Sequence, residues 1–158
     1  MNKTAHIISH SHWDREWYLP FEKHRFYFIK LINNIIEEFN SDGNSFKSFH
    51  LDGQTVLLED YFAVHPENLE IVKQLIEDKK LYIGPWYVLQ DAFLTSSEAN
   101  IRNLQIGLYD TKVYGHASKI GYFPDTFGIY GQAPQILKQA GIDTAAFGRG
   151  VKPTGFNN

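Results

Sequence analysis

The most informative absences in this chain of 158 residues concern cysteine, basic clusters and long apolar runs. Without cysteine the chain has no disulfide and no thiolate ligand, so any metal that it binds has nitrogen and oxygen donors. Lysine and arginine form no long run and the formal net charge is −3, which argues against a nucleic-acid partner. The apolar stretch near the start is too short for a signal peptide or a membrane span. We therefore expect a cytoplasmic protein that binds neither nucleic acid nor a membrane.

Short β-like runs alternate with segments of helical spacing, and no internal repeat interrupts them. Strands are expected at residues 5–9, 46–51, 81–83, 120–123 and 144–147. Helices are expected between them, with apolar stripes within residues 28–39, 56–62, 69–76 and 101–108 and a last helix between Pro134 and Gly141. Residues 95–98 have the spacing of a capping box. Alternating strands and helices pair in parallel through right-handed crossovers, so the expected fold class is α/β with parallel β/α units.

Polar side chains follow every expected strand. Parallel sheets bind their ligands at the carboxyl ends of the strands, so these side chains are candidates for one shared site. They are His12 and Asp14 after the first strand, Asp52 and Gln54 after the second, Trp86 and Asp91 after the third, Asp125 after the fourth and Arg149 after the fifth. Loops are polar in general, so coincidence is the alternative.

The segment His10-Ser-His12-Trp-Asp14 carries the clearest chemical signal. Alternate side chains of an extended backbone share a face, so the two imidazoles and the carboxylate would project together. Neutral imidazole and carboxylate are good ligands of Zn²⁺, which makes this triplet a half-site for a divalent metal. Metallo-β-lactamase-type hydrolases add a further histidine, whereas this chain has Arg15. Amidohydrolase barrels also place HxH on a first strand, so that class stays open.

The last residues, 150–158, read as a loop, and no helix pattern covers the fifth strand. A closed barrel needs more β/α units than the chain carries. We therefore expect residues 1–158 to be the N-terminal portion of a single catalytic domain, truncated at its C-terminal end and folded as part of an incomplete (β/α) barrel-like hydrolase or deacetylase domain. An open five-stranded sheet that is complete in itself is the alternative.

Four motifs in this order resemble glycoside hydrolase family 38, the zinc-dependent retaining α-mannosidases. They are HSHWDREW at 10–17, GPW at 84–86, PDTFG at 124–128 and GR at 148–149, and together they span most of the chain. Arg15 and Glu16 depart from the Pro-Gly of eukaryotic members, and Thr126 and Ile129 depart from their Asp-Pro-Phe-Gly-His. These departures indicate the bacterial branch of the family.

The resemblance implies a role for each matched residue. His12, Asp14 and Asp125 would bind one Zn²⁺, with Asp125 also the nucleophile. Trp17 would stack on the sugar, and Arg149 and Asp14 would contact the substrate. The implied reaction is hydrolysis of terminal α-mannosidic bonds, with retention, in an α-mannoside or a mannose-containing oligosaccharide. The family's general acid and fourth zinc ligand would lie downstream, so the fragment alone would be inactive. Nothing in the resemblance decides whether an oligomer forms.

Other interpretations of the same residues stay open. In another metal-dependent hydrolase, such as a carbohydrate deacetylase or an amidohydrolase, the metal would activate water and Asp125 would be a base. A non-catalytic sugar-binding module is a third possibility. On local sequence alone Asp125 is a turn residue, and the aromatic residues Trp17, Trp86 and Tyr87 pack the rim of the core. The polar residues Asp52, Gln54 and Asp91 either bind sugar hydroxyls or only shape turns.

Overall fold

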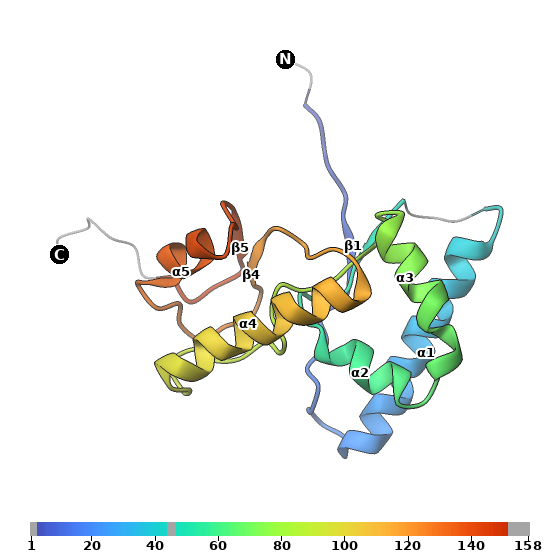
Figure 1. The fold of residues 1–158 in the computed structure, drawn as a ribbon, viewed down its shortest axis with the longest axis horizontal. Coiled ribbons are helices and arrows are strands. Elements are labelled where there is room, and N and C mark those ends of the chain that lie inside the picture. Colours follow the sequence, from blue (N-terminus) through green and yellow to red (C-terminus); the bar gives the residue numbers. More distant parts are fainter. Residues whose placement is uncertain (1–2, 44–46, 152–158) are drawn as a thin grey trace.

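The computed structural model describes residues 3–43 and 47–151, and its strands and helices alternate along the chain (Figure 1). The strands are β1 (Ser9–His10), β2 (Phe49–His50), β3 (Leu81–Tyr82), β4 (Gly121–Phe123) and β5 (Ala145–Phe147). The helices are α1 (Phe21–Asn40), α2 (Val56–Phe62), the 3-10 helix Pro66–Asn68, α3 (Leu69–Glu77), α4 (Ser97–Tyr114) and α5 (Ala133–Gln139).

All strand pairs in the described residues are parallel. One sheet has the order β1-β2-β3, and a second sheet pairs β4 with β5. A parallel bridge between Ile83 and Ala117 continues from β3 towards β4, and a bridge between Gln54 and Trp86 extends the pairing beyond β2 and β3. The expected α/β class with parallel β/α units is therefore confirmed, and the carboxyl ends of the strands lie on one side of the fold.

The helices that follow the predicted apolar stripes bury those stripes. In α1 the residues at helical spacing, Phe28, Ile32, Ile35, Ile36 and Phe39, are buried. α2 has the predicted bounds, and α3 buries Val72, Leu75 and Ile76. These side chains form the first of two apolar cores, together with β2, β3 and Leu51. A run of apolar residues every three or four positions therefore located this layer correctly.

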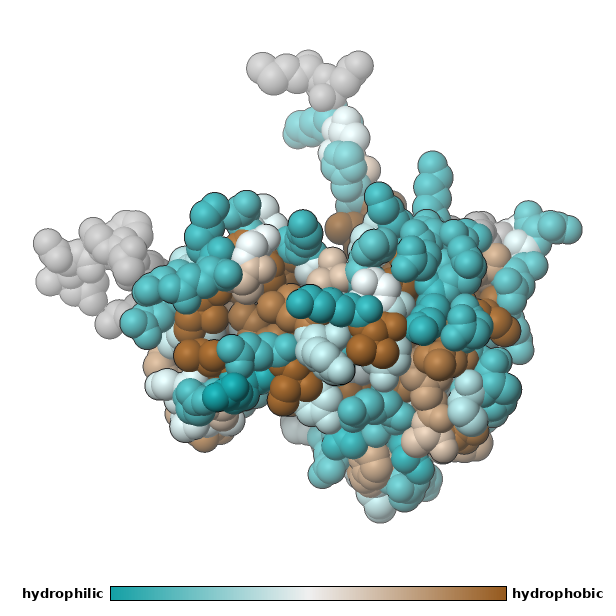
Figure 2. Space-filling view, in the orientation of Figure 1, coloured by the Kyte–Doolittle hydropathy of each residue, from teal (hydrophilic) through white to brown (hydrophobic). Residues whose placement is uncertain are grey.

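The second core is smaller and joins α4, α5 and β4. It contains Trp86, Leu104, Phe123, Ala133, Leu137 and Ile142. Figure 2 shows apolar surface gathered on this half of the molecule, whereas hydrophilic side chains dominate over α1 and α3. We call residues 85–88 and the facing side of α4 the junction, because Trp86 belongs to the second core while Tyr87 and Val88 pack against the first.

Two expectations about local structure were wrong. The first strand is Ser9–His10 rather than 5–9, and Ile7 and Ile8 are 93% and 68% exposed. β1 is the outer strand of its sheet and pairs only with β2, so no partner among the described residues holds this segment in a ladder. The second strand was expected to start at residue 46, which lies outside the described residues, and its described part is Phe49–His50.

Helix α4 packs through Leu104 and Leu108 of the expected apolar stripe and also through small and polar residues. Ile101 is exposed, while Asn100, Asn103 and Gly107 are buried. Asn103 donates from its side chain to the carbonyl of Val88 and accepts from the N–H of that residue, so an amide replaces an apolar contact. The cap residue is Ser96 instead of Thr95, because the Ser96 hydroxyl accepts from the N–H of Ala99.

None of the helices in the described part of the chain is both long and apolar enough to cross a membrane.

Candidate functional site

The candidate site lies where the ends of β1, β4 and β5 approach one another. His12 and Asp14 follow β1, Asp125 follows β4 and Arg149 follows β5. The carboxylates of Asp14 and Asp125 both face the imidazole of His12. His12 Nε2 lies 3.7 Å from Asp14 Oδ1 and 3.9 Å from Asp125 Oδ2. The parallel topology therefore brings residues more than a hundred positions apart in the sequence to the same imidazole nitrogen.

Arg149 is tied to Asp125 by two contacts. Its Nη2 lies 2.6 Å from Asp125 Oδ1, and its Nε donates to the carbonyl of Asp125 over 3.1 Å. The guanidinium also stacks on the ring of Phe127, 3.7 Å from the ring centroid. A planar fork held on an aromatic face fixes the direction of the carboxylate better than a flexible ammonium would. The remaining oxygen of Asp125 is thus left facing His12.

On its other side the imidazole of His12 faces a buried carboxyl group. Asp52 Oδ1 lies 3.4 Å from His12 Nδ1, and Asp52 is fully buried. Asp52 Oδ2 accepts from the N–H of Trp13 over 2.6 Å and from Nε2 of Gln54 over 2.8 Å. Burial raises the pKa of Asp52 to about 6, while the hydrogen bond from Trp13, the nearby charge of His12 and the hydrogen bond from Gln54 oppose that rise.

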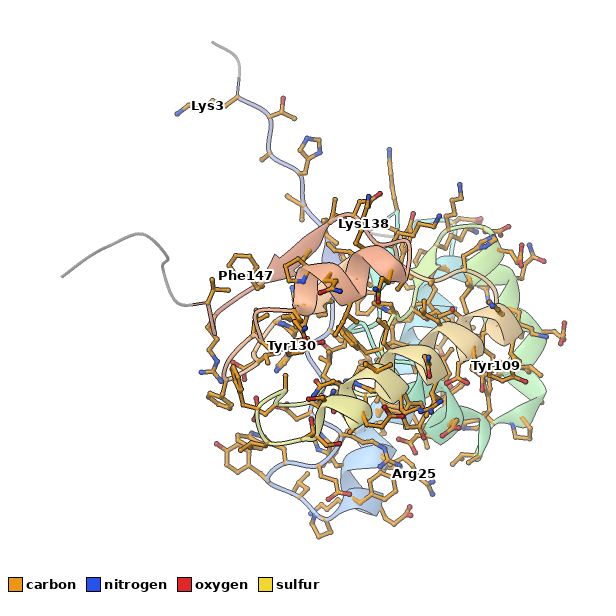
Figure 3. The ribbon with its side chains drawn as sticks, turned by 60° about the vertical axis from the view of Figure 1, so that its left-hand side comes forward. Lys3, Arg25, Tyr109, Tyr130, Lys138 and Phe147 are labelled. Atoms are coloured by element: carbon orange, nitrogen blue, oxygen red, sulfur yellow. The ribbon has the colours of Figure 1, made fainter. Side chains whose placement is uncertain are left out.

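A pocket of about 120 Å³ opens between these groups. It is lined by His12, Asp14, Leu89, Gln90, Asp91, Pro124, Asp125, Thr126 and Phe127. A larger pocket, of about 760 Å³, lies beside α5 and β5 and is lined mainly by apolar residues. Figure 3 shows Tyr130, Lys138 and Phe147 on that side of the molecule, far from Arg25 at the start of α1. We place the candidate site in the smaller pocket, because an imidazole and three carboxylates, those of His12, Asp14, Asp91 and Asp125, line it together.

The donor set at this pocket suits a divalent cation, although its present spacing does not form a metal site. Within residues 3–43 and 47–151, no three or more His, Asp and Glu side chains are grouped so that they could hold an ion. Two donors about 2.1 Å from one tetrahedral zinc ion would be about 3.4 Å apart. The distances from His12 Nε2 to Asp14 and Asp125 are slightly longer than this. His12, Asp14 and Asp125 therefore carry the donor types that zinc accepts, and their role as its ligands stays a prediction.

The remaining predicted residues have different outcomes. Trp17 is 63% exposed, stacks edge-on against Tyr18 and is not among the described residues that line the pocket, so its role as a sugar platform stays a prediction. Trp86 is a core residue that donates to the carbonyl of Tyr122. Tyr87 donates to Glu59, whose charge adds to burial in raising the pKa of Tyr87 to about 12.

The polar residues predicted at the strand ends differ in exposure: Asp52 and Gln54 are buried, whereas Asp91 lines the pocket. Asp52 and Gln54 are buried, so they support Trp13 and His12 instead of binding sugar hydroxyls directly. Asp91 does line the pocket, and one of its oxygens accepts from the N–H of Phe127. Sequence reasoning gave Phe127 no role, although its ring carries the Arg149 guanidinium and borders the pocket. The signal that could have found it is its position two residues after Asp125.

Comparisons with known proteins show what the chain as a whole is similar to. A family model described as the glycosyl hydrolases family 38 N-terminal domain matches residues 2–151. The chain is 65% identical, over 159 aligned residues, to a "Putative mannosylglycerate hydrolase" of Halalkalibacterium halodurans, covering 100% of this chain and 18% of that protein. It is 34% identical over 90 residues to an alpha-mannosidase of Saccharomyces cerevisiae, covering 55% of this chain and 8% of that protein.

Solved structures show the same similarity in three dimensions. An alpha-mannosidase from Enterococcus faecalis superimposes with a TM-score of 0.88 at 53% identity, over 92% of this chain and 16% of that one. A second protein from the same organism, in glycosyl hydrolase family 38, gives 0.79 at 48% identity, over 89% of this chain and 16% of that one. The chain thus spans less than a fifth of the length of these relatives.

Proposed function

The chain belongs to glycosyl hydrolase family 38, and from this premise we propose that it supplies the metal-binding and nucleophilic part of a retaining α-mannosidase. The observation that carries the proposal is the meeting of His12, Asp14 and Asp125 at one pocket, with Arg149 bound to Asp125. Its relatives include glycosidases named for mannosides, so the substrate class is an α-mannoside or a mannose-containing oligosaccharide. Within that class, the similarity to a mannosylglycerate hydrolase makes mannosylglycerate a specific candidate.

Asp125 is the residue that we assign as nucleophile. Its carboxylate would attack the anomeric carbon, the bond to the leaving oxygen would break, and a covalent glycosyl-enzyme would form. Arg149 holds one carboxylate oxygen by a charged contact, which fixes the direction of the carboxylate. The other oxygen points to the side of His12 and the pocket. Water, giving up a proton to the general acid's conjugate base, would then attack the same carbon, the bond to Asp125 would break, and mannose would leave with its configuration retained.

His12, Asp14 and Asp125 are the residues that would hold a zinc ion. When bound, the ion would supply Lewis-acid binding of two sugar hydroxyls, at C2 and C3, and so hold the mannose ring. Asp14, which is about half exposed, borders the pocket and would contact the same hydroxyls. Trp17 is assigned as the sugar-stacking residue from the family motif alone.

Retaining hydrolysis also needs a carboxyl group about 5–5.5 Å from the nucleophile to protonate the leaving oxygen. We propose that this general acid and a further histidine ligand lie outside the present chain. The small volume of the pocket supports this assignment, because sites for small molecules usually enclose about 300 Å³ or more. By the same argument residues 1–158 are one portion of a longer catalytic domain, and the portion alone would turn over no substrate.

The test uses the product of the complete reading frame that contains this chain. Asp125→Asn should lower kcat on an aryl α-mannoside and on mannosylglycerate by at least about a thousandfold, since the amide cannot attack. A chelator should abolish turnover, and added Zn²⁺ should restore it. Asp143→Asn is the matched control, because Asp143 pairs with Lys138 away from the pocket and its loss should leave turnover unchanged.

The outcome also separates the alternatives. A deacetylase or amidohydrolase uses metal-activated water, so a slow fluorinated mannoside would leave no sugar on Asp125. Recovery of a glycosylated Asp125 peptide by mass spectrometry would exclude that class and the non-catalytic sugar-binding module. Wild-type turnover by the Asn variant would overturn the assignment of Asp125.

A further inference from the structure

The buried carboxyl group behind His12 has one oxygen without a hydrogen bond. Asp52 Oδ1 is a buried atom that has no hydrogen-bond partner within the described residues, and His12 Nδ1 lies 3.4 Å from it. An unpaired polar atom in a buried position is destabilising. A proton on Nδ1 of His12 would remove that destabilisation with a small shift of the ring.

The second oxygen and the backbone keep the carboxyl group in this orientation. Asp52 Oδ2 accepts from the N–H of Trp13 and from Gln54, and the Gln54 side chain also donates to the carbonyl of Trp13. Gln54 in turn accepts from the N–H of Leu89. Asp52 therefore cannot turn its free oxygen away from His12 without breaking bonds to two separate segments.

We propose that Asp52 is a positioning residue that fixes the proton of neutral His12 on Nδ1 and so presents Nε2 as the donor atom to a divalent cation. A neutral imidazole carries one proton, so the nitrogen that faces Asp52 and the nitrogen that faces Asp14 and Asp125 must have opposite roles. Metal-ligating histidines commonly donate their other N–H to a carboxylate, which fixes the ring and strengthens the ligand. This inference rests on the proposed function for the identity of His12 as a ligand.

The substitution Asp52→Asn separates orientation from packing. Asn has nearly the same volume and tolerates the left-handed backbone of this position, where φ is 43°. Its amide oxygen must face the two donors from Trp13 and Gln54, because an amide NH₂ there would meet donors only. The NH₂ group then faces Nδ1 of His12, which must accept, so the imidazole proton moves to Nε2. The variant should keep its fold, but its His12 Nε2 would carry the proton and would have no free lone pair for a metal ion.

The tautomer can be measured without any metal. Long-range ¹H–¹⁵N spectra of the full chain, labelled at histidine and recorded at pH 8, distinguish Nδ1–H from Nε2–H, and a His12→Gln spectrum assigns His12 among the seven histidines. We expect Nδ1–H in the wild type and Nε2–H in Asp52→Asn. The control Asp110→Asn removes a carboxylate that accepts from the hydroxyl of Thr55, and it should leave His12 unchanged.

Zinc affinity is the second measurement, made by calorimetry on the product of the complete reading frame. Asp52→Asn should weaken Zn²⁺ binding by about 10- to 100-fold, while Asp110→Asn should not. A wild-type His12 with its proton on Nε2, or an Asn variant with the wild-type tautomer, would overturn the inference, and the wild-type spectrum decides even if the variant does not fold. Inversion of the tautomer without Zn²⁺ binding by the wild type would support the role of Asp52 and refute the metal part of the proposed function.

Discussion

The N-terminal and C-terminal halves of this molecule are packed in different ways. The first half closes its core between three helices and the sheet β1-β2-β3, and many of its side chains are fully buried. The second half has a smaller core and leaves an apolar pocket of about 760 Å³ beside α5 and β5. The candidate site draws His12 and Asp14 from the first half and Asp125 and Arg149 from the second. The packing therefore differs on the two sides of one site.

The largest effect is expected at the junction. A Cβ on Gly107 would lie 2.2 Å from the carbonyl oxygen of Pro85 and 2.5 Å from the backbone nitrogen of Tyr87. Backbone atoms cannot move aside as a flexible side chain can, so α4 would have to shift. Gly107→Ala should lower the free energy of unfolding by about 4 kcal/mol, even though alanine favours a helix by about 1 kcal/mol. Urea denaturation followed by circular dichroism would measure it.

Gly131→Ala is the matched control for that substitution, because no atom lies within 4 Å of its added Cβ and its φ is not positive. It should change stability by less than about 0.5 kcal/mol. Equal effects of the two substitutions would mean that α4 is not packed tightly against residues 85–87.

A pair of leucine truncations compares the two cores directly. Leu57 in α2 is fully buried, whereas Leu137 in α5 borders the large apolar pocket. Leu57→Ala leaves an enclosed cavity and should cost about 3 kcal/mol, while Leu137→Ala enlarges space that is already open and should cost about 1.5 kcal/mol. Thermal and urea unfolding of both variants would measure the difference. A Leu137 variant that loses as much stability as the Leu57 variant would show that the second core is as closed as the first.

Stability at mildly acidic pH depends on a partly buried histidine of the first sheet. Burial and the neighbouring His10 lower the pKa of His50 to about 4, and its ring packs against Tyr122. The unfolded chain has an ordinary histidine pKa of about 6.5, so between these values the unfolded state binds more protons and stability falls as pH falls. Going from pH 7 to pH 5, the wild type should lose about 2 kcal/mol relative to His50→Phe.

Urea unfolding of both proteins at the two pH values would measure this loss. The comparison with the Phe variant matters because Asp52 has a raised pKa and changes stability in the opposite direction in both proteins. Parallel pH profiles for the two proteins would contradict the prediction.

The smallest effect on stability is expected at Arg149. Arg149 and Asp125 are each about half exposed, so their ion pair contributes less than about 1 kcal/mol. Arg149→Lys keeps the charge but loses both the second contact, to the Asp125 carbonyl, and the stacking on Phe127. The free energy of unfolding of the chain should change by less than about 1 kcal/mol, while kcat of the product of the complete reading frame on an aryl α-mannoside falls at least about tenfold. A large loss of stability with unchanged kcat would make Arg149 a structural residue.

Much of the fold could be predicted from the sequence because its first half follows simple periodicity. The stripe from Phe28 to Phe39 and the bounds of α2 emerged from apolar spacing alone. Spacing failed where contacts with distant residues decide the structure. Asn103 and Gly107 are buried because the backbone of residues 85–88 packs against them. No local pattern in the sequence of α4 predicts that contact. Ile7 is typical of a strand residue, but β1 begins only at Ser9, because it is an outer strand that pairs with β2 alone.

The candidate site shows the same division. The pattern His12-x-Asp14 indicated metal ligands directly, and the family motifs pointed to Asp125 and Arg149, which the parallel topology brings to the same place. The support behind these residues could not be foreseen. An Asp-Gly-Gln turn gives no sign that Asp52 is buried beneath His12, because that contact joins positions 40 residues apart in the chain. Side chains that bind are easier to recognise from sequence than the side chains that hold them.

The 3.9 Å approach of His12 to Asp125 joins two bodies that owe their packing to different cores. By thermodynamic linkage, a molecule that binds both residues would stabilise the packing of the two halves against each other by an amount that rises with its concentration relative to its Kd. Conversely, a substitution that weakens the packing of the two halves against each other would lower the affinity for that molecule, even where the substituted residue does not contact it. The distance between these two side chains thus reports whether the two halves stay packed together. A pair of spectroscopic labels could follow that distance during unfolding.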